Sequence, residues 1–438
     1  MANFDNYGLD KDFEIKGFFS DDKSKVLTTE ARSGILNYKQ NQIVLELFDE
    51  LPRNNDVSYG LFKEVDRIYG WDSSANFLIL DIFGSPFGTS TVPGFPLVKY
   101  SVKDFKIFEV RDGGLSYIES LPSTFDMLET LEFGSMTFSF DNIDKWVGKP
   151  LLNFTRGENQ LTVTTATSDY KSTKVKLYSQ SVLVEDVGST SYSFKDTEFE
   201  TSYAIQLTHL KNERVPFDIF YDVAIKFKEL IEVLSKTPLS FTSINLICEN
   251  QIQNDCLKII KGKFFVRQQR ERMVWSKAEI SLAKLNDSFE SILNNWFDKS
   301  EQLDFIVRQY TKNLHGNPYL EDSLVDAIRN LEVFSKNFRN DFIKKNKKRK
   351  IYLRDLLNEL FDSLPKGDYD KIFGNQEKAN LVKKLVDTRN YFTHGKRKKN
   401  DWSITDFNEM YDMRESLQKV LNYYIYKEIG LNKDGGDE

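Results

Sequence analysis

The feature that most constrains the fold is a change in the spacing of apolar residues near residue 270. Before that point, apolar and polar residues mostly alternate in short runs, which is typical of half-buried β-strands. After it, apolar residues recur every three or four positions, as they do on one face of an α-helix. A chain of 438 residues is also too long for one ordinary core. The sequence therefore predicts a β-rich domain over residues 1–270 and an α-helical domain over residues 276–432.

Strand-like runs fill most of the first region. Those ahead of residue 210 span residues 43–48, 77–83, 105–110, 136–140, 161–167, 174–184 and 203–209. Turn-forming clusters such as 84–86 and 112–114 separate them, which favours antiparallel sheets packed as a sandwich or a barrel. A helical pattern follows at 216–234, and two more strand-like runs come after it, at 241–248 and 257–266. We therefore assign this helix to the β-rich domain.

The second region reads as a bundle of amphipathic helices. Their apolar stripes occupy residues 282–296, 303–314, 324–342, 353–364, 381–392 and 407–425. Ser403 together with Asp406 matches a capping box for the last helix, which we expect to end at Gly430. The predicted fold class is therefore α+β and multidomain, with a β-rich antiparallel domain followed by an all-α bundle.

Composition and motifs exclude several classes of protein. A formal net charge of -6 argues against a protein that coats DNA, although basic runs at 344–350 and 396–399 can still bind nucleic acid. The cysteines and histidines are scattered without metal-ligand spacing, so we expect no metal, disulfide or other cofactor. The sequence has no phosphate loop, zinc-protease motif or nucleophile elbow. Without a long apolar run or a secretion signal, we expect a cytoplasmic protein that does not enter a membrane.

The densest cluster of chemically active residues lies near the end of the helical region, where residues 385–395 read LVDTRNYFTHG. Arg389 falls within the apolar stripe of this predicted helix, which indicates either an acidic partner or a site for an anion. Asn390 and His394 are four residues apart and share the adjoining face, and Gly395 is a typical helix end. The guanidinium of Arg389, the amide of Asn390 and the imidazole of His394 therefore converge at one helix end. This combination of groups is suited to a site that binds a phosphodiester.

Arg389, Asn390 and His394 resemble the ribonuclease motif of the HEPN (higher eukaryotes and prokaryotes nucleotide-binding) superfamily, and the surrounding sequence resembles its ApeA-like branch. Catalytic HEPN domains carry an Arg, a polar residue, three intervening residues and a His. The resemblance covers nearly the whole chain, because ApeA-like proteins also place a β-rich region before a C-terminal HEPN domain. It implies an ApeA-like sensor or regulatory domain over 1–270 and a HEPN bundle over 276–432.

The resemblance implies a metal-independent endoribonuclease. His394 would remove the 2′-hydroxyl proton or protonate the leaving 5′-oxygen, Arg389 would stabilise charge on the phosphate, and Asn390 completes the motif. Glu332 matches the Leu-Glu of the family's first long bundle helix, and it can pair with Arg389 through a bidentate contact or remain a solvated residue. Asp387 can orient His394, although a surface acid is the interpretation that we favour.

The resemblance also implies partners. Members of the family are bacterial anti-phage, abortive-infection proteins, and related HEPN nucleases cut tRNA or other structured RNA. Lys396, Arg397, Lys398 and Lys399 begin two residues after His394, so we expect them to contact RNA phosphates. One motif offers one guanidinium and one imidazole, so we expect a homodimer, or a higher even-numbered oligomer, in which two motifs share a cleft. A phage-derived trigger would bind the N-terminal domain.

Two other interpretations remain open from the sequence. The HEPN module can be non-catalytic and bind a nucleotide or a protein, with the β-rich domain as its recognition surface, and His394 is then dispensable. The β-rich domain can instead be a carbohydrate-binding domain on a helical scaffold. Glycan binding without RNA cleavage would indicate that arrangement.

Overall fold

The computed structural model describes most of the chain, and the chain divides into two compact units. The described residues are 4–39, 42–52, 64–92, 95–111, 121–148, 152–156, 161–165, 172–177, 180–193, 198–210, 213–253, 256–268, 280–285, 288–316, 319–346, 350–395 and 402–431. The β-rich unit comprises Met1–Ile225 and Leu239–Lys277, and the helical unit comprises Lys226–Pro238 and Ala278–Glu438. The predicted fold class, an antiparallel β-rich region followed by an all-α region, is confirmed.

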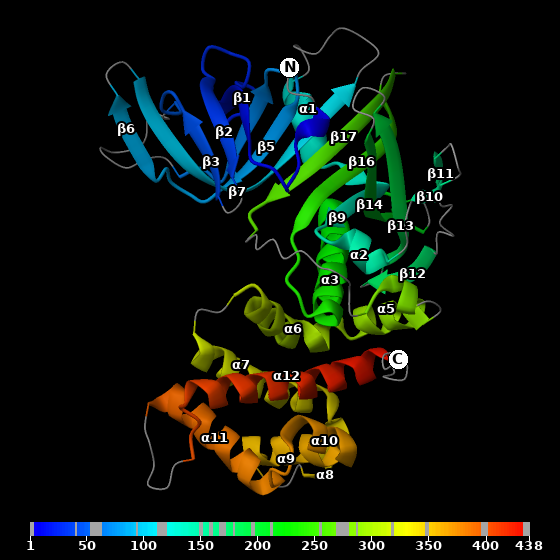
Figure 1. The fold of residues 1–438 in the computed structure, drawn as a ribbon. Coiled ribbons are helices and arrows are strands. Elements are labelled where there is room, and N and C mark those ends of the chain that lie inside the picture. The colour runs from blue at the N-terminus through cyan, green and yellow to red at the C-terminus, as the bar shows by residue number, and fades with distance from the viewer. Residues whose placement is uncertain are drawn as a thin grey trace. The chain divides into compact units, whose positions relative to one another are not determined.

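The first part of the β-rich unit is a sheet that closes on itself (Figure 1). Its strands are β1 (Phe13–Ser20), β2 (Arg32–Lys39), β3 (Gln42–Leu47), β4 (Arg67–Asp72), β5 (Phe77–Ile82) and β7 (Phe95–Arg111). The pairing runs β7-β3-β2-β1-β4-β5 and returns to β7, and every pair is antiparallel. Phe19 is completely buried, and a Cβ at Gly70 would lie 2.7 Å from its ring, so glycine is needed at that position.

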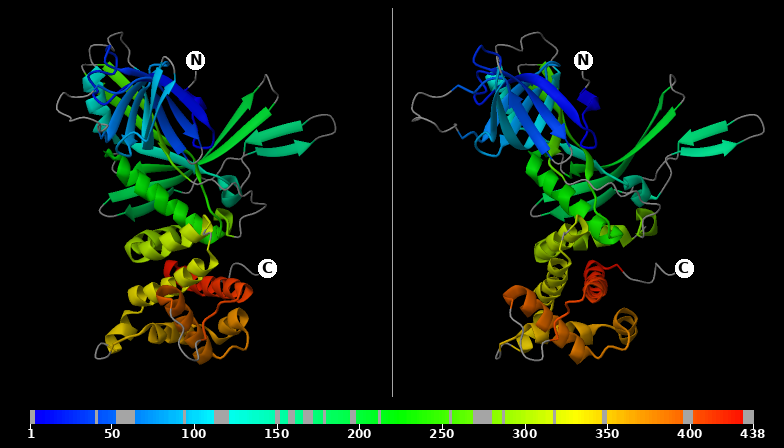
Figure 2. Two further views of the ribbon diagram at one scale, coloured as in Figure 1. Left: turned by 90° about the vertical axis from the view of Figure 1, so that its left-hand side faces the viewer. Right: turned by 60° about the vertical axis from the view of Figure 1, so that its left-hand side comes forward.

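The same sheet continues beyond β7, because residues 104–111 of this strand pair with a further strand (Figure 2). The strands that follow in spatial order are β17 (Cys256–Val266), β16 (Phe241–Gln253), β9 (Ser135–Phe140), β14 (Glu198–His209), β13 (Gln180–Ser193) and β12 (Ser172–Leu177). Smaller elements of this unit are η1 (Phe4–Asn6), β6 (Gly88–Val92), α1 (Leu121–Glu129), β8 (Glu132–Phe133), α2 (Ile143–Val147), β10 (Leu152–Arg156), β11 (Leu161–Thr165) and β15 (Val215–Pro216). The single strand predicted over 174–184 is wrong, because β12 and β13 form an antiparallel pair there.

Helix α3 (Phe217–Ser235) contributes residues to both units, whereas the sequence assigned all of it to the β-rich domain. From Lys226 onward it belongs to the helical unit. Within that unit, Trp296 Nε1 donates to the carbonyl of Lys226 at 2.8 Å, and the Tyr426 hydroxyl donates to the carbonyl of Val233 at 3.2 Å. The apolar spacing continues unchanged along the helix, so the sequence could not show where its partners change.

The helical unit is built around α7 (Leu320–Phe338), which contacts α6, α9, α11 and α12 (Figure 1). Its other helices are α4 (Leu282–Leu285), α5 (Phe289–Asp298), α6 (Ser300–Leu314), α8 (Asn340–Lys345), α9 (Leu353–Ser363), α10 (Lys366–Phe373), α11 (Lys378–His394) and α12 (Phe407–Ile429). Within the part of the chain that is described, no helix combines the length and the apolar character needed to span a membrane.

Four details of the helical unit differ from the sequence prediction. The stripe over 282–296 is divided between α4 and α5, and the stripe over 324–342 is interrupted at Arg339 between α7 and α8. The short α10 was not predicted. The N-terminal cap of α12 is Asp406, whose side chain accepts from the Glu409 N–H at 3.0 Å, so the capping box starting at Ser403 is wrong.

One pair of carboxylates in the β-rich unit makes its stability depend on pH. Asp81 and Asp104 face each other across the β5–β7 pair. Burial, followed by the charge of Asp81, raises the pKa of Asp104 to about 6. The folded protein therefore keeps a proton that the unfolded chain releases near its ordinary pKa of 3.8. The free energy of unfolding should fall as the pH rises from about 4 to about 6, with the loss complete above 6.

Asp104→Asn is expected to remove this pH-dependent loss in the free energy of unfolding. It should raise the free energy of unfolding by about 1 kcal/mol near neutral pH, after allowance for the partial exposure of the carboxylate, and leave it unchanged at about pH 4. Denaturant unfolding of both proteins across this pH range measures the difference, with Glu14→Gln, an exposed carboxylate on β1, as the control. A difference that is constant with pH would assign the effect to packing.

Candidate functional site

The candidate site lies at the end of α11. The helix ends at His394 because Gly395 adopts the left-handed conformation, with φ of 65°, and donates its N–H to the carbonyl of Tyr391 at 2.7 Å. Glycine takes this conformation without steric cost. The predicted helix end is confirmed, and His394 occupies the last turn.

The buried stripe of α11 is narrower than predicted, because Val386, Arg389 and Phe392 are only half-buried. Leu381, Val382, Leu385 and Thr388 are buried, whereas the Arg389 side chain is 33% exposed and lies at the edge of the stripe. Thr388 can be buried because its hydroxyl donates to the Lys384 carbonyl at 2.7 Å and accepts the N–H of Ile404 at 2.9 Å. The guanidinium is therefore only partly withdrawn from solvent and can reach an anion.

Arg389 contacts its two predicted neighbours. Its Nη1 donates to Oδ1 of Asn390 at 3.3 Å, and its Nη2 lies 3.9 Å from Oε2 of Glu332 on α7. The predicted bidentate contact with Glu332 is wrong, because the other carboxylate oxygen lies 2.6 Å from Nζ of Lys336. Glu332 is 16% exposed, and its two carboxylate oxygens face two different cations, Arg389 and Lys336. Arg389 retains donors that can bind phosphate oxygens.

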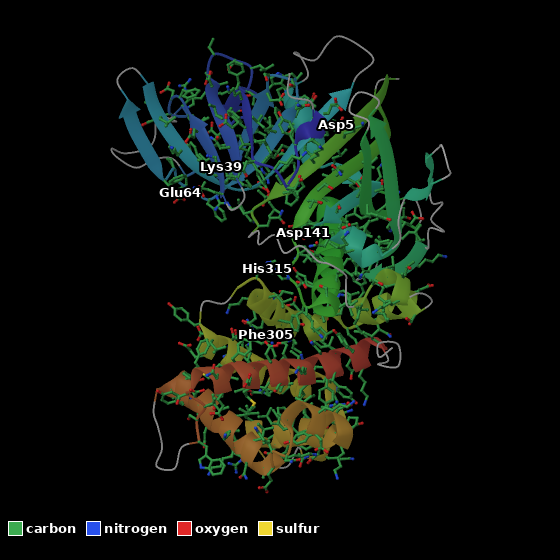
Figure 3. The ribbon with its side chains drawn as sticks, in the orientation of Figure 1. Asp5, Lys39, Glu64, Asp141, Phe305 and His315 are labelled. Carbon is green, nitrogen blue, oxygen red and sulfur yellow. The ribbon has the colours of Figure 1, made fainter. Side chains whose placement is uncertain are left out.

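His394 is the histidine that the fold leaves most accessible. The chain has three histidines, and His209 is buried in the β-rich unit. The Nε2 of His315, at the end of α6 (Figure 3), lies 2.7 Å from Oε1 of the fully buried Glu232. His394 is exposed, and no described residue forms a hydrogen bond or an ion pair with it. Its imidazole is therefore available to exchange a proton with a ligand.

Asp387 neither contacts His394 nor remains a simple surface acid. Its Oδ2 accepts the backbone N–H of Trp402 at 3.3 Å. The indole of Trp402 also lies under the ammonium of Lys383, with Nζ 4.1 Å from the ring centroid. The sequence interpretation missed Trp402, which lies three residues after the end of the basic run at 396–399.

The predicted basic RNA contacts lie outside the described residues. Lys396, Arg397, Lys398 and Lys399 all belong to residues 396–401, which the structure does not describe. Their position in the sequence, directly after α11 and before Trp402, is unaffected.

Helix α11 carries a charged donor and an imidazole within its last two turns. Five residues of helix separate Arg389 from His394, which corresponds to a rise of about 7.5 Å. Asn390 and His394 are four residues apart, so they lie on one face of α11. The guanidinium of Arg389 can bind a phosphate, and the imidazole of His394 can transfer a proton.

Comparison with protein-family models also divides the chain into a β-rich part and a helical part. The family model described as ApeA N-terminal domain 1 matches residues 14–296, and the model described as Apea-like HEPN matches residues 301–435. No curated protein and no solved structure matches the chain. The second range contains the helix that carries Arg389 and His394 as well as Glu332 on α7. The chain therefore belongs to the ApeA-like HEPN family, with an ApeA N-terminal domain followed by a HEPN domain.

Proposed function

We propose that the protein is a metal-independent endoribonuclease and that Arg389, Asn390 and His394 carry its activity. The observation that supports this most directly is an exposed imidazole without a described partner, five residues from a guanidinium that keeps free donors. Groups of these two kinds are what transesterification of RNA requires. Membership of the HEPN family adds a second, independent argument.

In the proposed reaction, the imidazole of His394 accepts the proton of a 2′-hydroxyl. The 2′-oxygen then attacks the adjacent phosphorus, and the bond to the 5′-oxygen breaks, which leaves a 2′,3′-cyclic phosphate and a 5′-hydroxyl. The leaving 5′-oxygen takes a proton from an imidazolium or from water. Arg389 stabilises the charge that develops on the phosphate oxygens.

Asn390 and Glu332 act on Arg389. The amide oxygen of Asn390 accepts from one terminal nitrogen, and Glu332 attracts the other from α7. Between them they restrict the orientation of the guanidinium before RNA binds, which lowers the entropic cost of binding. Lys396, Arg397, Lys398 and Lys399 are proposed to bind the RNA backbone, with an affinity that falls as salt rises.

The proposed role in the cell is anti-phage defence by abortive infection, with tRNA as a candidate substrate. The ApeA N-terminal domain, which matches residues 14–296, would then bind the phage-derived trigger. A cytoplasmic location fits a protein that acts on cellular RNA.

Incubation of the purified protein with total bacterial RNA, with and without EDTA, tests the proposed activity. We expect discrete fragments with cyclic phosphate ends in both samples. Intact RNA under both conditions, in the presence of lysate from phage-infected cells as a source of trigger, would contradict the proposal. Cleavage that EDTA abolishes would assign the chemistry to a metal instead.

We also propose that two copies of the chain share one catalytic cleft. In-line cleavage needs one group near the nucleophile, another near the leaving oxygen and positive charge between them. One α11 end supplies a single imidazole and a single guanidinium, and a twofold axis would supply the second of each.

Subunit mixing is expected to reveal the shared cleft. If both histidines are needed, mixing wild-type chains with an equal amount of His394→Ala chains leaves about one dimer in four fully active, because pairing is random. The specific activity of the mixture, measured after subunit exchange, should therefore fall below the half expected from dilution. Activity that falls only by dilution, or a monomer that cleaves at full rate, would exclude a shared site.

A further inference from the structure

Trp402 is an exposed tryptophan that the fold holds in place beside the candidate site. Its side chain is 39% exposed. Its N–H binds Oδ2 of Asp387, and two residues later the N–H of buried Ile404 binds the hydroxyl of Thr388. Two successive positions of α11 therefore fix the backbone of this segment, so the indole is presented from a restrained position and not from a freely moving chain.

The attachment point places Trp402 on the side of α11 that carries Asn390 and His394. Lys383, Asp387, Asn390 and His394 follow one another at spacings of four, three and four residues, which defines one face of a helix. Asp387 precedes His394 by seven residues, a rise of about 10 Å. Lys383, whose ammonium lies over the indole, is one further turn before Asp387, so the ring can take a base a few nucleotides away from a phosphate bound beside His394.

The charge around the indole favours a polyanion over an apolar partner. The Lys383 ammonium lies 4.1 Å from the ring centroid, so a cation accompanies one face of the indole. Phe407 offers a contrast, because it is 65% exposed at the start of α12 and no described cation lies over its ring. Aromatic rings accompanied by cations are typical of surfaces that bind single-stranded nucleic acid.

We infer that Trp402 and Lys383 form a subsite in which an unpaired base of the RNA stacks on the face of the indole that Lys383 does not cover, while the ammonium binds the adjoining phosphate. The inference rests on the proposed function, since it names the part of the RNA that the cleavage site requires. It makes an unpaired nucleotide near the cut bond part of the substrate requirement. Trp402 is then a binding residue that positions the RNA and not a catalytic one.

Binding of a short 2′-O-methyl oligouridylate tests the subsite, because this probe presents bases and phosphates but has no 2′-hydroxyl to lose a proton. Trp402→Ala is expected to weaken its binding by about ten- to a hundredfold, and Trp402→Phe by much less. An otherwise identical oligomer with abasic sugars should bind Trp402→Ala and the wild type equally. Phe407→Ala, which removes an exposed ring that no described cation covers, is the matched control and should bind like the wild type.

The outcomes separate the subsite from the catalytic proposal. Equal affinity of Trp402→Ala and the wild type for the oligouridylate, or an equal loss with the abasic probe, would overturn the subsite even if RNA cleavage is observed. Trp402-dependent binding of bases without any RNA cleavage would support the subsite and overturn the ribonuclease. A change in the mass of the assembly in Trp402→Ala, without a change in RNA affinity, would overturn the subsite and assign Trp402 to a protein interface.

Discussion

Replacing His394 with alanine is expected to lower the rate of RNA cleavage by about a hundredfold or more. The imidazole is the proposed proton acceptor, and an alanine cannot accept a proton. Because the side chain is exposed and has no described partner, the same substitution should leave the free energy of unfolding within about 0.5 kcal/mol of the wild type. Single-turnover cleavage at saturating RNA measures the first quantity, and denaturant unfolding measures the second.

Thr393→Ala is the matched control for His394→Ala. Thr393 is also exposed in the last turn of α11, and its removal changes the helix end without removing a titratable group. It should cleave RNA at the wild-type rate. Full activity of His394→Ala would place the chemistry on other residues, and an equal loss in both variants would indicate that the helix end, and not the imidazole, is what the reaction needs.

Local sequence signals were sufficient to predict α11 and its histidine. A glycine in the left-handed conformation ends the helix as expected, and the spacing of the motif fixes Asn390 and His394 on one face. The exposure of Arg389 could not be predicted in the same way. Thr388 and Arg389 lie on either edge of the apolar stripe, and burial of Thr388 depends on its hydrogen bond with Ile404, sixteen residues further along.

In the β-rich unit, too, local sequence patterns predict the elements but not the contacts between distant segments. Alternating residues predicted most of the long strands, because alternation reflects local exposure of the two faces. The closure of the first part of the sheet depends on β7, which pairs with β3, β5, β6 and β17. Those pairings join residues far apart in the sequence, and strand patterns alone do not specify which strands pair.

The contacts of Arg389 predict that its replacement lowers the rate of RNA cleavage much more than it lowers the stability of the fold. Arg389→Ala is expected to lower cleavage by about a hundredfold to a thousandfold, because it removes the donors that stabilise charge on the phosphate. From its place in the apolar stripe alone, the substitution would also be expected to destabilise the fold. Its partial exposure and the 3.9 Å separation from Glu332 indicate a weak ion pair, so the loss of stability should be below about 1 kcal/mol.

Arg389→Lys distinguishes charge from geometry. Lysine keeps the positive charge but carries its three donors on one nitrogen, so it cannot reproduce the planar fork in which separate nitrogens face Asn390 and Glu332. We therefore expect a rate much closer to that of Arg389→Ala than to that of the wild type. Lys336→Ala, which removes the other cation bound to Glu332, is the matched control and should retain most of the activity. A fully active Arg389→Lys would show that the site needs only a point charge, and a fully active Arg389→Ala would remove this residue from the mechanism.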